Sequence, residues 1–355
     1  MYLESIETSA NNIGDTISVG FTHNIATPVI VAGSEGNFTG NSLPTDWMQS
    51  NLNSFGCHPL RHLCMPASHD AGMSTLDGKT ALATTQNTVT QNLDIAGQLT
   101  YGARYFDIRP VIGGGIFKTG HYDQVDCCWD GGNGQSIDDV ISQVNSFLAQ
   151  NQELVILDLS HAYDSDTGYN ELTEDEWNQL LQQLLALNYR FVAPPDTTDL
   201  SFLTLQDFIG TSPAVMVIFD QDAQNVTLGS YAGQGFYSSS QFSVYNQYSN
   251  TDNADNMISD QLAKLKAQRP NPDSGLFLLS WTLTQQAGTS LDIVGKSIID
   301  LAQQVFPNLF NSNSLWDAMS PNTYPNFIMI DAWPQDMRLT AFVVAMNTQF
   351  TGRCS

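Results

Sequence analysis

The alternation of short apolar runs with amphipathic segments most restricts what this chain can fold into. After residue 43 there are about eight such runs, and most are continuously apolar. Continuous apolar strands are typical of parallel sheets that are covered on both faces. The predicted strands are residues 60–66, 103–110, 115–122, 153–163, 189–194, 214–220, 275–284 and 326–333.

The segments between these runs have the periodicity of helices. Over 137–148, apolar residues recur at i, i+3, i+4 and i+7, and Ser136 is a suitable N-cap. Residues 173–187 begin with a capping residue and acidic side chains. Further helices are predicted over 252–268, 289–306 and 335–349. Strand–helix alternation repeated about eight times predicts an α/β fold of the (β/α) barrel type, with a doubly wound open sheet as the alternative.

The first 43 residues have a different pattern. Short β-branched runs are separated there by Gly, Asn and Ser, which predicts a β-rich N-terminal extension over 1–43. Residues 44–355 are then the barrel domain. A chain of 355 residues is within the range of one large barrel with insertions.

The charge balance restricts the partners. Twelve Lys and Arg residues against 36 Asp and Glu residues give a net charge of −24. Such a surface repels nucleic acid, so we expect no nucleic-acid partner, and it also repels a strongly anionic bilayer. No apolar run is long enough to span a membrane. The oligomeric state is left open.

Two glycosylation sequons favour an extracellular, glycosylated protein, although the chain shows no signal peptide. The sequons begin at Asn37 and Asn225. Cys57 and Cys64 flank the first predicted strand and could form a disulfide. The cysteines lack the paired spacing of a zinc site.

Polar side chains gather where the predicted strands end. Active sites of barrels of this class lie at the carboxyl ends of the strands. The chain has six histidines, and three of them, His69, His121 and His161, fall at predicted strand ends. One such histidine is often structural, but three at one rim favour a functional site.

Arg109 also falls at a strand end, in a chain where cations are scarce. It could form a structural ion pair with Asp107, or it could bind an anion, since a guanidinium group matches phosphate oxygens. Two histidines and an arginine suit phosphodiester cleavage by a general base, a general acid and a fixed cation. Asp70 and Asp331 are available to orient the two imidazoles.

Three motifs resemble the X domain of phosphatidylinositol-specific phospholipase C. They are "PASHDAGM" (66–73), "GARYFDIRP" (102–110) and "GHY" (120–122). The longer segments "PLRHLCMPASHDAGM", "ELVILDLSHAYD" and "NFIMIDAWP" are most similar to the branch of X-domain-containing phospholipase-C-like phosphodiesterases. The resemblance extends from about Trp47 to Trp333 and implies a distorted TIM barrel.

The resemblance also implies roles for the residues that match the motifs. His69 is similar to the general base that activates the inositol 2-hydroxyl, and His121 to the general acid for the leaving diacylglycerol oxygen. Asp70 resembles the carboxylate paired with the acid, and Asp331 the carboxylate that supports the base. Arg109 resembles the arginine that replaces calcium in the bacterial enzymes.

Two positions differ from the family pattern. Ser160 stands where the calcium-dependent enzymes have an acid, so with Arg109 the sequence disfavours Ca²⁺ and implies no cofactor or metal. Asp70, Asp107 and Asp158 could still hold a metal weakly. His161 takes the place of a substrate-binding lysine. Asp107 and His161 are therefore candidate substrate-binding residues, with a structural role for His161 left open.

The sequence thus predicts a phosphoric diester hydrolase of lipid metabolism, acting on a phospholipid or another phosphodiester, with a cyclic phosphate as product. Contact with a membrane surface is left open, with Trp129 as a candidate anchor. One alternative is a non-catalytic barrel that binds a phosphorylated lipid or glycan. The other is a metal-dependent glycerophosphodiesterase-like barrel, whose opening His-Arg pair is missing from this sequence.

Overall fold

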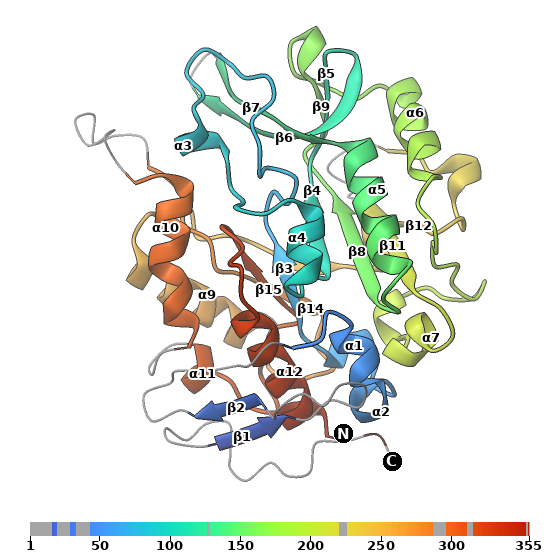
Figure 1. Ribbon diagram of the computed structural model, residues 1–355, viewed down its shortest axis with the longest axis vertical. Helices are drawn as coiled ribbons and strands as arrows, with labels where there is room; N and C mark the ends of the chain where they lie inside the picture. Colours follow the sequence, from blue (N-terminus) through green and yellow to red (C-terminus); the bar gives the residue numbers. More distant parts are fainter. Residues whose placement is uncertain are drawn as a thin grey trace.

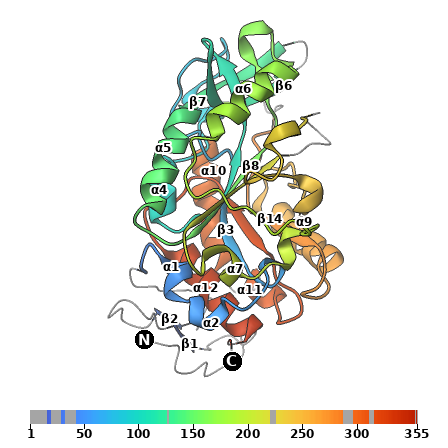
Figure 2. The same cartoon turned by 90° about the vertical axis from the view of Figure 1, so that its right-hand side faces the viewer.

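Eight parallel strands form one curled sheet at the centre of the molecule (Figures 1 and 2). The computed structural model describes residues 16–19, 29–32, 43–125, 128–219, 226–286, 296–310, 315–352 and 354. The order in the sheet is β12-β11-β8-β4-β3-β15-β14-β13. Its strands are β3 (Met65–Ser68), β4 (Tyr105–Ile108), β8 (Leu154–Leu159), β11 (Ala214–Phe219), β12 (Phe236–Ser238), β13 (Val244–Asn246), β14 (Leu276–Ser280) and β15 (Phe327–Ile330).

Within the described residues no pairing joins the edge strands β12 and β13, so the sheet is an open half-barrel. Every residue of β3, β4, β11, β14 and β15 is buried, as their continuous apolar runs predict. The predicted α/β class and the distorted TIM barrel are confirmed.

Helices pack against this sheet through their apolar sides. In α5 (Ile137–Leu148), Ser136 caps the first turn and the i, i+3, i+4 side chains are buried as predicted. Thr173 caps α6 (Glu174–Leu184) in the same way. The other helices are α1 (Trp47–Ser50), α2 (Leu52–Phe55), α3 (Thr85–Thr88), α4 (Ile95–Thr100), α7 (Leu205–Ile209), α9 (Ala254–Gln268), α10 (Ile298–Val305), α11 (Leu315–Ala318) and α12 (Arg338–Thr351). Among the described residues, no helix is long and apolar enough to cross a bilayer.

A second, five-stranded sheet stands over the carboxyl ends of β4 and β8 (Figure 1). Its strands are β5 (Pro110–Gly113), β6 (Ile116–Val125), β7 (Cys128–Ser136), β9 (Tyr163–Asp164) and β10 (Asn170–Glu171). The prediction that 115–122 is a barrel strand is therefore wrong. Gly114 and Gly115 have φ of 67° and 75°, which makes a tight turn, and β6 folds back antiparallel to β5.

One further predicted strand is absent, and two strands lie where none was predicted. Residues 189–194 form no named strand, and only Arg190 makes an isolated bridge to Val215. The polar and aromatic segment 231–250 instead contains β12 and β13. Phe236 and Tyr237 are buried there, so tertiary packing overrides the loop-like composition.

Strands β1 (Thr16–Val19) and β2 (Val29–Ala32) pair antiparallel beside α12, within the predicted N-terminal extension. The boundary at residue 43 stays a prediction. The sequons at Asn37 and Asn225 lie outside the described residues.

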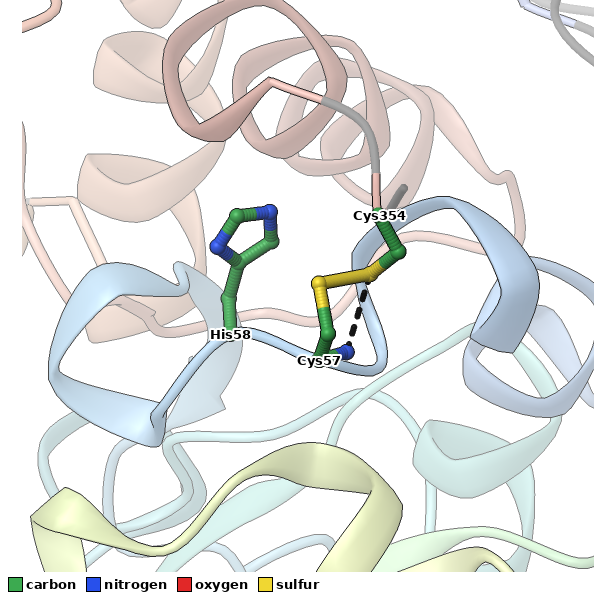
Figure 3. Close-up of side chains that lie close together, drawn as sticks. All are labelled: Cys57, His58 and Cys354. Atoms are coloured by element: carbon green, nitrogen blue, oxygen red, sulfur yellow. Dashed lines mark hydrogen bonds between the residues drawn. A yellow bond between two sulfur atoms is a disulfide. The ribbon is translucent and has the colours of Figure 1, made fainter.

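The disulfide links Cys57 to Cys354, across 297 residues, and not to Cys64 (Figure 3). Cys64 is a free thiol that is buried just before β3. Beside the disulfide, the His58 ring lies 3.2 Å from the carbonyl oxygen of Gly352. The bond therefore ties the end of α12 to the segment that leads into the first barrel strand.

A buried ion pair joins the amino ends of β4 and β8. Arg104 Nε lies 2.7 Å from Glu153 Oε2, and both side chains are fully buried. Glu153 also accepts from the backbone N–H groups of Met48 and Gln49, at 3.3 and 2.8 Å. The pair thus holds α1 under the barrel, at the end opposite to the predicted site.

We expect Glu153→Gln to lower the free energy of unfolding by about 3 kcal/mol, because it leaves the buried Arg104 guanidinium without a counter-charge. Denaturant unfolding followed by circular dichroism measures this. The matched control is Glu171→Gln on the exposed strand β10, with an expected change within about 0.5 kcal/mol. Equal effects of the two substitutions would contradict this role of the pair.

Candidate active site

The pairing of β15 with β3 places two predicted site residues side by side. Ile330 is in register with Ser68, so the residues that follow, Asp331 and His69, are neighbours at the carboxyl edge of the sheet. Asp331 Oδ1 lies 2.8 Å from His69 Nδ1, although the two residues are 262 positions apart. The carboxylate therefore holds the imidazole with its Nδ1–H toward β15 and its Nε2 toward the centre of the barrel mouth.

Arg109, just after β4, contacts three of the other site residues. Its Nε lies 2.5 Å from Asp70 Oδ1 and 3.1 Å from Asp107 Oδ2, and its Nη2 lies 2.9 Å from His69 Nε2. Burial lowers the pKa of Arg109, but the carboxylates of Asp107 and Asp70 outweigh it and hold the pKa above its usual value. The guanidinium is a permanent cation at the centre of the site.

His121 reaches the site from β6 of the second sheet. Its Nδ1 lies 2.9 Å from the carbonyl oxygen of Thr88, which accepts a hydrogen bond from Nδ1–H. Its Nε2 therefore points toward Asp70, with 3.7 Å to Asp70 Oδ2. The side chains of His69 and His121 are 23% and 22% exposed, so solvent and substrate can reach both rings.

Asp70 lies between the two histidines. Its Oδ2 is 3.6 Å from His69 Nε2 and 3.7 Å from His121 Nε2, and its side chain is fully buried. The resemblance implied a carboxylate for His121 alone, whereas the structure places Asp70 near both rings and against Arg109. Its backbone is left-handed, with φ of 41°, and its N–H lies 3.3 Å from Asp107 Oδ2.

The candidate substrate-binding residues Asp107 and His161 are joined through Ser160. The Ser160 hydroxyl lies 2.8 Å from Asp107 Oδ1 and 2.8 Å from His161 Nδ1. Burial favours the neutral form of Asp107, but Arg109 and His69 outweigh it and hold its pKa well below its usual range. His161 is an exposed residue at the rim, and the partial loss of water around its ring and the charge of Arg109 lower its pKa. Asp107 therefore orients other groups, while His161 is open to a ligand.

Burial and nearby charges have opposing effects on the pKa of His69. Burial lowers the pKa of the imidazole, but the carboxylates of Asp70 and Asp331 outweigh burial and raise the pKa to about 9. The contact of Nε2 with Arg109 favours the neutral ring, because two donors would otherwise face each other. The two carboxylates outnumber the one guanidinium, so the pKa moves upward.

A divalent metal does not fit the centre of this site. His69, Asp70 and Asp107 offer ligand atoms within 4.8 Å of one another. The guanidinium of Arg109 contacts all three residues, and its charge repels a second cation there. Asp158, the third carboxylate that the sequence offered to a metal, accepts a hydrogen bond of 2.5 Å from the Tyr105 hydroxyl.

Sequence reasoning missed two residues that position the site. Thr88 orients His121 through its backbone carbonyl, and Gln91 Nε2 lies 2.6 Å from the carbonyl oxygen of His69. Gln91 Oε1 also accepts from the backbone N–H of Trp333, so it ties the end of β15 to the end of β3. No local pattern in the sequence identifies either residue, because the partner of each hydrogen bond is remote in sequence.

Two other cations and the candidate anchor Trp129 make structural contacts. Arg104 is at the amino end of β4, and Lys118 pairs with Asp77 at 2.6 Å. Trp129 stacks on Tyr169, with ring centroids 5.3 Å apart and planes 24° apart, so it packs within the second sheet. Asp220 and Cys127 lie outside the described residues.

Comparison with known proteins supports the resemblance. No family model matches the sequence. The chain is 31% identical over 146 residues to human PI-PLC X domain-containing protein 2, a match that covers 36% of this chain and 46% of that protein. The mouse protein 2 is 30% identical over 146 residues, or 36% of this chain and 42% of that protein. The chain thus matches less than half the length of these relatives.

The fold is shared with solved bacterial enzymes. Phosphatidylinositol-specific phospholipase C from Staphylococcus aureus superposes with a TM-score of 0.57 at 16% identity, over 86% of this chain and 97% of that chain. The enzyme from Listeria monocytogenes gives a TM-score of 0.50 at 16% identity, over 86% of this chain and 99% of that chain. At these identities the likeness concerns the fold alone.

We expect Asp331→Asn to lower the pKa of His69 clearly from about 9, because it removes one of the two carboxylates that stabilise the imidazolium. An NMR titration of the histidine ring protons measures this. The matched control is Asp273→Asn, which removes the carboxylate 2.9 Å from His62 and leaves the titration of His69 unchanged. A pKa of His69 that stays near 9 in Asp331→Asn would contradict the assigned contact.

Proposed function

We propose that this relative of the PI-PLC X domain-containing proteins is a phosphodiesterase of the phospholipase C type. The proposal rests above all on one observation. The Nε2 atoms of His69 and His121 both lie within 3.7 Å of Asp70 Oδ2, next to the permanent cation Arg109. Two partly exposed imidazoles on either side of one carboxylate, with a permanent cation beside it, suit acid–base cleavage of a phosphate diester.

In the proposed reaction, His69 accepts the proton of a substrate hydroxyl that is adjacent to the phosphate. The hydroxyl oxygen attacks phosphorus and a new P–O bond closes a cyclic phosphodiester. The P–O bond to the leaving alcohol breaks, and His121 donates a proton to the departing oxygen. Arg109 donates to the phosphoryl oxygens, where negative charge increases in the transition state.

The carboxylates keep these groups in place. Asp331 holds Nδ1 of His69, so Nε2, which faces Arg109 Nη2, is the nitrogen that takes the proton. Thr88 holds Nδ1 of His121 and leaves its Nε2 toward Asp70. Asp70 and Asp107 hold the guanidinium of Arg109. These buried contacts fix the site before substrate arrives, which lowers the cost of reorganisation during reaction.

The proposed substrate is an inositol phospholipid or a related diester with a hydroxyl beside the phosphate. His161 at the rim is available to a hydroxyl of the headgroup, since Ser160 holds its Nδ1. The net charge of −24 disfavours strong attraction to anionic membranes, so contact with a lipid surface is brief or peripheral in this proposal. The disulfide Cys57–Cys354 supports an oxidising, extracellular location.

We expect His69→Ala and His121→Ala each to lower kcat on phosphatidylinositol by about 10²–10⁴-fold, because each removes a proton-transfer group. His62→Ala is the matched control, since His62 lies before β3 at the opposite end of the barrel, and its activity stays at the wild-type level. Phosphorus NMR detects the cyclic phosphate, and a panel of other diesters tests the headgroup.

Activity is expected to persist in EDTA, because Arg109 supplies the positive charge. Loss of activity in EDTA would contradict the role of Arg109. A folded protein that cleaves no diester in the panel would support the alternative of a binding barrel.

The ascending limb of the kcat/KM profile of the wild-type protein should follow the titration of His69 near pH 9, because His69 must be neutral to accept a proton, while the need for a protonated general acid limits the activity at higher pH. Folding raises the pKa of His69 from 6.5, so its stabilising contribution is complete below pH 6.5 and is lost as the pH rises through about 9. The activity therefore increases over the same pH range in which the protein loses the stabilising contribution of His69. Initial rates over pH 5–10 measure the profile, and an optimum below pH 7 would contradict His69 as the base.

A further inference from the structure

Two residues at the candidate active site have a left-handed backbone, although neither is a glycine. Asp70 follows β3 with φ of 41°, and Ala332 follows β15 with φ of 51°. A residue with a Cβ persists in this conformation only where the surrounding structure holds its backbone. These two residues directly follow His69 and Asp331, so the groups that hold them also hold the proposed base and its carboxylate.

Hydrogen bonds fix the peptide groups on both sides of Asp70. On the amino side, the carbonyl oxygen of His69 accepts from Gln91 Nε2 at 2.6 Å. On the carboxyl side, the carbonyl oxygen of Asp70 accepts from Thr90 Oγ1 at 3.1 Å and from the backbone N–H of Met73 at 2.9 Å. The orientations of two rigid peptide groups define φ and ψ of the residue between them, so these bonds set the direction of the Asp70 side chain.

Thr90 and Gln91 also hold the turn after β15. The backbone N–H of Ala332 donates to the carbonyl oxygen of Thr90 at 2.7 Å, and the backbone N–H of Trp333 donates to Gln91 Oε1 at 3.0 Å. Thr90 therefore binds both left-handed residues, Asp70 through its hydroxyl group and Ala332 through its carbonyl group. Thr90 and Gln91 are buried, so bulk water does not compete for these bonds.

Resting on the proposed function, we infer that Thr90 is a positioning residue that directs the carboxylate of Asp70 toward both histidines. Asp70 Oδ2 lies 3.6 Å from His69 Nε2 and 3.7 Å from His121 Nε2, and a rotation of the Asp70 backbone would carry it away from both rings. Without the Thr90 hydroxyl, the carbonyl oxygen of Asp70 keeps the N–H of Met73 as a partner. The protein should therefore fold, while the left-handed residue is less constrained.

Two substitutions separate the hydrogen bond of Thr90 from its packing. Thr90→Val keeps the shape of the side chain and removes the hydroxyl group, whereas Thr90→Ser keeps the hydroxyl group and removes the methyl group. We expect Thr90→Val to lower kcat on phosphatidylinositol by about 10-fold with KM nearly unchanged, because a misplaced carboxylate slows the chemical step and not the binding of substrate. Thr90→Ser should keep most of the wild-type kcat. If Thr90→Val does not fold, Thr90→Ala removes the same hydroxyl group.

The titration of His69 gives a readout that does not need catalysis. Burial lowers the pKa of His69, but the carboxylates of Asp70 and Asp331 outweigh it and raise the pKa to about 9. An NMR titration of the histidine ring protons should therefore give a lower pKa for His69 in Thr90→Val and a pKa near 9 in Thr90→Ser.

Thr348→Val is the matched control. Thr348 is also buried, and its hydroxyl group donates to a backbone carbonyl oxygen at 2.8 Å, within α12. The preceding residue, Asn347, binds the backbone of Cys64 before β3, so this bond lies at the end of the barrel opposite to the site. Thr348→Val should lose stability to denaturant about as Thr90→Val does, because both lose a hydrogen bond of the same kind. Its kcat and its titration of His69 should be those of the wild type.

Three outcomes would overturn the inference. The first is a wild-type kcat with a His69 pKa near 9 in folded Thr90→Val. The second is an equal loss of kcat in Thr90→Val and Thr348→Val, and the third is a larger loss in Thr90→Ser than in Thr90→Val. If the wild-type protein cleaves no diester, the proposed function fails, whereas the titration of His69 still decides whether Thr90 positions Asp70.

Discussion

The parallel pairing of β15 with β3 is the constraint on which the site depends. It brings the last barrel strand against the first, and the register places Asp331 next to His69. A shift of one residue would turn Asp331 to the other face of the sheet, because side chains alternate along a strand. Gln91 reinforces the same junction through the carbonyl oxygens of His69 and Ile330. The orientation of His69 is thus a consequence of how the half-barrel is assembled.

Charges are buried at both ends of this sheet for different purposes. At the amino ends, Arg104 and Glu153 compensate each other and also satisfy backbone groups of α4 and α1. At the carboxyl ends, Arg109 is shared by two carboxylates and an imidazole, and the rings remain about one-fifth exposed. A buried charge is tolerated only when it has partners. The network at the mouth keeps some exposure and can therefore bind a ligand, whereas the fully buried pair of Arg104 and Glu153 can only stabilise the fold.

Most of the barrel could be predicted from the sequence, because six strands are continuous apolar runs between amphipathic segments. The motif residues His69, Asp70, Arg109 and Asp331 were also identified, since they directly follow such strands. Strand β6 was assigned to the wrong sheet, because an apolar run does not reveal whether its partner is parallel or antiparallel. Strands β12 and β13 were missed, since short edge strands have no periodic signal. The partner of Cys57 was missed as well, because disulfide partners cannot be deduced from spacing.

The sequence by itself determined the α/β class, the helices with their caps, and the strand ends where ionisable groups collect. Local periodicity and capping chemistry are enough for these, because they depend on neighbours a few residues away. Only the tertiary structure decided that His121 arrives from a second sheet and that Asp70 lies between both imidazoles. These features depend on register and on backbone groups such as the Thr88 carbonyl, which meet only when segments distant in sequence pack together.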